Sequence, residues 1–139
     1  MKIIDFQNRE RKISIKKYLV DYDKSSKSKF QFNVKQFFKT FWQYDAVCEE
    51  FRIPGCLLRI DLINFDKKIA VECQSMIHDN FSTHFHKTRS AFLKSWRRDE
   101  SKQKWIEDVI QFKFLEIYPE DLKLLSRKYI LEKFSIDIL

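Results

Sequence analysis

Leu58-Arg-Ile-Asp61 and Ile69-Ala-Val-Glu72-Cys-Gln74 are two short apolar runs that each carry an acid, and they decide the fold. Both runs have the length and the alternation of a β-strand. Because residues two apart on a strand share a face, we expect Asp61 on the polar face of the first strand, with Ile60 and Leu62 together on the opposite face. Glu72 and Gln74 share a face of the second strand in the same way.

Residues 64–68 separate the two runs and are expected to form the loop of a hairpin. Asp61 and Glu72 then lie on adjacent strands, where their carboxylates can converge on one divalent cation. The alternative is a hairpin whose acidic face is simply solvated. The sequence on either side of the hairpin bears on this choice.

The flanking segments alternate between helical and strand-like patterns. Apolar residues recur every three or four positions over residues 30–44, after Ser28 as a helix N-cap, and this spacing predicts an amphipathic helix. The other expected elements are strands over 47–53 and 112–117, a loop over 75–87, and helices over 88–109 and 121–134. The order helix, three strands, helix, strand, helix predicts an α/β fold with a mixed four-stranded sheet.

Composition favours one compact domain over residues 1–139, with residues 1–27 as an N-terminal extension packed on the core. The chain is 44% hydrophobic and 16% aromatic, which suits a sizeable core. No apolar run reaches the roughly 18 residues of a membrane span, and the charged start lacks the apolar region of a signal peptide. Three cysteines without a Cys-x-x-Cys pair predict reduced thiols, so we expect a cytoplasmic protein without a membrane partner.

A surplus of positive charge, 27 Lys and Arg against 20 acids, predicts a polyanionic partner. Such side chains pair with phosphates, and we expect the strongest cluster over residues 87–104. The alternative for any one of them is a solvated surface charge. The candidate DNA contacts are Lys29, Lys35, Arg59, Lys87, Arg89, Lys94, Arg97, Arg98 and Lys102.

Three short motifs occur in a recognisable order. Glu72, Gln74 and His78 match the pattern Glu-x-(Asp/Gln/Lys)-Gly-x-x-His, except that Ser75 replaces the Gly. Arg-Ile-Asp61 precedes it, and Arg98-Asp, Lys102 and an apolar strand follow. In these features residues 28–121 resemble the very-short-patch-repair-like endonucleases of the PD-(D/E)xK superfamily.

This resemblance implies a restriction-endonuclease-like core that hydrolyses DNA phosphodiester bonds with Mg²⁺ or Mn²⁺. Asp61 and Glu72 would bind the metal, Gln74 would orient the attacking water, and His78 would assist as a base or phosphate contact. Gln31 falls at the position in the first helix where the family has a Glu. The resemblance further implies a phage or mobile-element nuclease of the homing, nicking or junction-resolving kind, acting in a bacterial host.

Other interpretations remain open at the level of sequence. Gln31 and Gln74, both neutral, allow a non-catalytic nucleic-acid-binding module that keeps the fold, and a structural phage protein is a further alternative. Glu49 or Glu50 is an alternative source of a third carboxylate. A zinc site built on Cys73 is less favoured, because strand alternation directs Cys73 towards the core. A homodimer or a partner domain is expected where two DNA strands must be cut.

Overall fold

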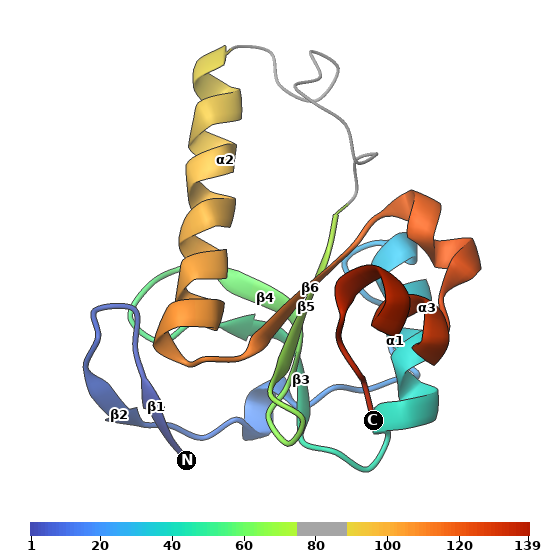
Figure 1. Cartoon of the computed structure of the whole chain (residues 1–139). Helices are drawn as coiled ribbons and strands as arrows, with labels where there is room; N and C mark the ends of the chain where they lie inside the picture. Colours follow the sequence, from blue (N-terminus) through green and yellow to red (C-terminus); the bar gives the residue numbers. More distant parts are fainter. Residues whose placement is uncertain (75–88) are drawn as a thin grey trace.

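The structure, a computed structural model, describes residues 1–74 and 89–139 (Figure 1). It is a mixed α/β fold whose four-stranded sheet and flanking helices confirm the predicted order. The elements are β1 (Lys2–Ile4), β2 (Glu10–Lys12), the 3₁₀ helix η1 (Lys16–Tyr18), α1 (Lys29–Trp42), β3 (Val47–Arg52), β4 (Arg59–Asn64), β5 (Ile69–Cys73), α2 (Arg89–Lys104), the π-helical turn η2 (Trp105–Val109), β6 (Lys113–Ile117), the 3₁₀ helix η3 (Pro119–Leu124) and α3 (Arg127–Phe134).

The main sheet has the strand order β3-β4-β5-β6. The pairs β3–β4 and β4–β5 are antiparallel, whereas β5 and β6 are parallel. Parallel neighbours need a long crossover connection, and here the segment containing α2 makes it. β4 continues through Asn64, so the hairpin loop is one residue shorter than predicted.

Helix α1 packs on one face of this sheet. Its N-cap is Ser28, as predicted, and the Ser28 hydroxyl accepts a hydrogen bond of 3.1 Å from the Gln31 amide. Val34, Phe38 and Trp42 recur every four residues and are fully buried. The Trp42 indole also donates to the carbonyl of Ile138, so the C-terminal segment joins the same cluster.

The opposite face is covered by the N-terminal hairpin and the π-helical turn. Ile3 of β1, Phe51 of β3 and Ile106 of η2 belong to this second cluster. The Trp105 indole donates to the carbonyl of Ile4 at 3.1 Å, which joins the hairpin to the end of the long helix. Helix α2 itself extends away from the sheet, and its described side chains are mostly exposed (Figure 1). None of the helices in the described ranges has the length and apolar character needed to cross a membrane.

The single helix predicted over residues 121–134 is wrong. The chain forms η3, turns at residues 125–126 and starts α3 with Ser126 as a new N-cap. The cause is the buried carboxylate of Asp121, which accepts hydrogen bonds from the Tyr118 amide at 2.9 Å, the Tyr129 hydroxyl at 2.5 Å and the Lys133 ammonium. These contacts draw α3 back against η3.

Asp121 makes the stability of this end of the molecule depend on pH. Burial alone would raise its pKa, but the bonds from Lys133, Tyr129 and the Tyr118 amide outweigh burial and lower it. Its stabilising contribution is therefore present above the pKa of the unfolded state, about 3.9, and is lost as the pH falls further. We expect Asp121→Asn to lower the free energy of unfolding by about 1–3 kcal/mol near neutral pH.

Urea denaturation followed by circular dichroism checks this expectation. The difference between Asp121→Asn and the wild type should shrink as the pH falls below about 3.9, because the carboxylate of the unfolded chain is protonated there and the advantage of the charged form in the native state declines. Asp23→Asn is the matched control, because the side chain of Asp23 is 93% exposed. An equal effect of the two substitutions, or a difference that does not change with pH, would contradict the role of Asp121.

Candidate functional site

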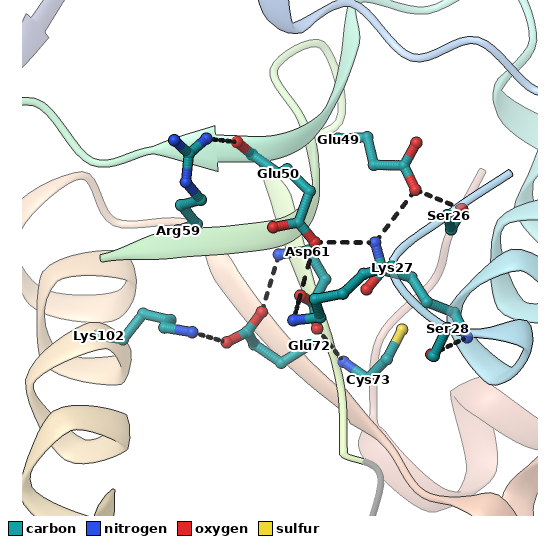
Figure 2. A network of polar contacts seen from close by, with 11 residues as sticks. Ser26, Lys27, Ser28, Glu49, Glu50, Arg59, Asp61, Glu72, Cys73 and Lys102 are labelled. Carbon is teal, nitrogen blue, oxygen red and sulfur yellow. Dashed lines mark hydrogen bonds and ion pairs between the residues drawn. The ribbon is translucent and has the colours of Figure 1, made fainter. Parts of the chain in front are cut away.

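The two acids of the hairpin meet where the regular pairing of β4 with β5 stops. That pairing ends at Leu62 and Val71, one residue before Asp61 and Glu72. Beyond this point side-chain carboxylates replace the backbone carbonyls as hydrogen-bond acceptors between the two strands. The Asp61 amide donates to Glu72 Oε2 at 2.9 Å, and the Cys73 amide donates to Asp61 Oδ2 at 2.7 Å (Figure 2). Each carboxylate is thus held by the backbone of the neighbouring strand, and both are buried.

The pairing of β3 with β4 is interrupted at the same level. Glu50, which lies opposite Asp61, has φ 52°, a left-handed conformation that is uncommon for any residue other than Gly. The Arg59 guanidinium donates to the Glu50 carbonyl at 3.1 Å. The interruption reverses the alternation, so Ile60 packs in the cluster of the second face and Leu62 in that of α1. The prediction that Ile60 and Leu62 share a face is therefore wrong.

Two lysines from distant segments pair with the acids. Lys27, in the segment before α1, places its Nζ 3.4 Å from Asp61 Oδ1 and 3.8 Å from Glu50 Oε1. Lys102 of α2 pairs with Glu72 Oε1 (Figure 2). The Lys102 side chain is 14% exposed whereas that of Lys27 is 65% exposed, so Lys27 is the more accessible cation of the site.

The electrostatic balance of the site disfavours ionisation of Glu72. Burial first, and then the negative charge of Asp61, raise the pKa of Glu72 to about 8, and Lys102 offsets only part of this effect. For Lys27 burial would lower the pKa, but the charges of Asp61 and Glu50 outweigh it and raise the pKa. A buried carboxylate with a strongly raised pKa beside a second carboxylate is typical of functional sites.

Gln31, in the first turn of α1, lies beside this cluster. Its Nε2 donates to Glu49 Oε2 and to Glu50 Oε1, each at 3.1 Å. Its Oε1 is buried and has no hydrogen-bond partner among residues 1–74 and 89–139. An unsatisfied buried oxygen costs roughly 1–3 kcal/mol, so it requires an explanation, such as a ligand that the oxygen binds.

On the other side of Glu72 lies an acid that the sequence interpretation did not include. Glu116 of β6 is the register neighbour of Glu72. The Gln74 amide donates to Glu116 Oε2 at 3.0 Å, so Gln74 is held towards β6. Alternation along residues 112–117 could have pointed to Glu116, because Leu115 and Ile117 on either side of it pack in the cluster of α1 and leave Glu116 on the opposite face.

The candidate DNA contacts fall into four groups. Lys29, Arg59, Arg89, Lys94, Arg97 and Arg98 are exposed, whereas Lys102 is engaged by Glu72. The prediction that Lys35 contacts DNA is wrong. Lys35 is fully buried and donates to the carbonyls of Asp21 and Lys24 and to Glu49 Oε1, which leaves no ammonium proton for a phosphate. The predictions for His78 and Lys87 concern residues outside the described ranges.

Within residues 1–74 and 89–139, no three or more His, Cys, Asp or Glu side chains are grouped so that they could hold a metal ion together. The three cysteines are free thiols, and Cys73 packs against the cluster of α1, as its alternation predicts. Comparisons of the chain with models of protein families, with curated proteins and with solved structures found no match.

Proposed function

We propose that this protein is a metal-dependent DNA endonuclease with a restriction-endonuclease-like core. One observation carries the proposal: the carboxylates of Asp61 and Glu72 are buried together at the interrupted end of two adjacent strands, where burial first and then the charge of Asp61 raise the pKa of Glu72. Such a pair is stabilised by a cation. The surplus of seven positive charges over the whole chain favours DNA as the substrate.

The donor set suits Mg²⁺ or Mn²⁺. Mg²⁺ is commonly bound by one or two carboxylates and completes its coordination with water and substrate phosphate. Asp61 and Glu72 would be those carboxylates, and Gln31 Oε1, which has no partner within the described part of the chain, is a further hard oxygen in the adjoining cluster. The bound metal would polarise the phosphodiester and lower the pKa of an attacking water.

The residues of this chain supply binding and charge. Lys27, largely exposed beside Asp61, can bind a phosphate oxygen of the substrate. Nuclease sites of this kind commonly have a lysine at the position of the neutral Gln74. In this protein Lys102 of α2 supplies a positive charge beside Glu72 instead. Gln74, held by Glu116, remains the candidate for orienting the water. His78 keeps its predicted role as a base or phosphate contact.

A supercoiled plasmid assay tests the proposal. Purified protein is incubated with the plasmid in Mg²⁺, in Mn²⁺ or in EDTA, and in parallel with linear and four-way-junction DNA. We expect nicked or linear products with either metal and none in EDTA. EDTA removes the divalent cation that the two carboxylates would hold to polarise the phosphodiester. Cleavage that persists in EDTA would contradict the proposal.

A second function is favoured by one specific observation. Lys27 and Lys102 pair with Asp61 Oδ1 and Glu72 Oε1, oxygens that a metal would also use. If these ion pairs are permanent, the protein is a nucleic-acid-binding module that keeps a nuclease-like site without its chemistry. Binding of DNA without cleavage in any metal would support this alternative.

A further inference from the structure

A groove rich in basic residues has two walls. One is the N-terminal extension, and the other is the end of β3 together with the turn that follows this strand. Its volume is about 740 Å³, and its lining includes Arg11 of β2, Lys16 and Lys17 of η1, and Arg52 of β3. No acid is among the described residues that line it. All four basic residues are exposed. None of these positions was among the candidate DNA contacts in the sequence.

The cations of the groove are largely uncompensated. Arg11 pairs with the buried Asp5 at 2.7 Å. In the part of the chain that the structure describes, Lys16, Lys17 and Arg52 form no ion pair with an acid. Uncompensated cations gathered around a hollow attract a polyanion and raise its local concentration.

The walls of the groove are fastened to each other. The Phe6 amide donates to the Pro54 carbonyl at 2.8 Å, and the Gln7 side chain donates to the Gly55 carbonyl at 2.5 Å. On the η1 side, the rings of Tyr18 and Phe51 pack edge to face with centroids 5.2 Å apart. The extension is therefore docked on the sheet, and the basic residues are presented on an ordered support.

The groove leads to the carboxylate site. A second hollow, of about 340 Å³, shares Lys17 and Tyr18 with the basic groove. Its lining also includes Lys24 and Lys27 and the acids Asp21, Glu49 and Glu50. Lys27 is the residue that contacts Asp61. The two hollows are therefore neighbours, and Lys16, Lys17 and Lys27 mark a path along them towards Asp61, whose length suits a polymer better than a single small anion.

From this path we infer that the N-terminal extension binds the phosphodiester backbone of DNA and guides it to Asp61 and Glu72. The identity of the polymer rests on the proposed function, whereas the binding surface rests on the groove itself. Lys16 and Lys17 are the main phosphate contacts, and Lys27 continues the line of cations into the site.

Fluorescence anisotropy with a labelled DNA duplex tests the inference, in EDTA so that cleavage plays no part. We expect Lys16→Gln/Lys17→Gln to weaken binding at least about fivefold, and to reduce the slope of log K against log salt by about 2, since each phosphate contact contributes roughly 0.9. Lys123→Gln/Lys128→Gln is the matched control, because it removes the same charge from two exposed lysines in η3 and α3, which do not line the groove.

The outcomes separate the two proposals. A selective loss of affinity in Lys16→Gln/Lys17→Gln, with an unchanged circular dichroism spectrum, supports the groove even if no metal promotes cleavage. Equal affinities of the two double variants would overturn the groove, whatever the result of the cleavage assay. Arg52 is left intact because its Nε donates to the Cys56 carbonyl at 2.8 Å and so supports the turn.

Discussion

Cleavage of supercoiled DNA in Mg²⁺ is expected to fall by at least about a thousandfold in Asp61→Asn and in Glu72→Gln. Each substitution removes one of the two buried carboxylates that would bind the metal. Loss of metal binding forfeits several kcal/mol of transition-state stabilisation, and about 4 kcal/mol corresponds to a thousandfold in rate. The measurement is the initial rate of plasmid nicking at saturating metal concentration.

The matched controls are Asp23→Asn and Glu132→Gln, which make the same chemical changes at exposed positions and should cleave as the wild type does. Loss of folding is not expected to explain an inactive Glu72→Gln. Because the pKa of Glu72 is raised to about 8, the native protein loses stability as the pH rises through that value, and Gln carries no charge to bury. Wild-type cleavage rates in both site variants would disprove the site assignment.

Lys35→Ala is expected to lower the free energy of unfolding by about 3–5 kcal/mol, because it breaks a buried ion pair and leaves its partners unpaired. The Lys35 ammonium is fully buried, and it bonds to the carbonyls of Asp21 and Lys24 at 3.0 and 2.7 Å and to Glu49 Oε1 at 3.1 Å. The measurement is urea denaturation. Lys39→Ala, one turn further along α1 with a side chain 42% exposed, is the control.

A double variant distinguishes the lost ion pair from the lost packing. Lys35→Met/Glu49→Gln retains the apolar stem and removes the charge that Lys35 neutralises, so it should recover part of the stability lost in Lys35→Ala. An effect of Lys35→Ala no larger than that of Lys39→Ala would contradict this role. The hydrogen bonds of Lys35 to the carbonyls of Asp21 and Lys24 also affect the candidate site, because they fix the segment just before Lys27.

Much of the fold could be predicted because its signals are local. The apolar spacing and the cap at Ser28 are sufficient for α1, and the alternation around Asp61 and Glu72 is sufficient for two adjacent strands. The break between η3 and α3 could not be predicted in this way. The break depends on the buried carboxylate of Asp121, which accepts hydrogen bonds from Tyr129 and Lys133. The spacing of apolar residues along the helix does not reveal such bonds.

The candidate site also has a part that the sequence could predict and a part that it could not. The adjacency of Asp61 and Glu72 follows from two strands joined by a short loop. Their partners do not, because Lys27 and Lys102 are far from the hairpin in sequence and reach it only when α1 and α2 are in place. Lys35 has the sequence pattern of a surface lysine, but in the folded protein the loop before α1 and Glu49 of β3 engage its ammonium group.

The sequence by itself therefore determined the order of the elements, the hairpin and the presence of a pair of acids on neighbouring strands, because period and turn signals act over a few residues. Only the tertiary structure decided the reversal of alternation at Glu50 and Asp61, the lysines that balance the acids, and the basic groove of the N-terminal extension. Those features depend on burial and charge between segments distant in the chain, which no local pattern of residues records.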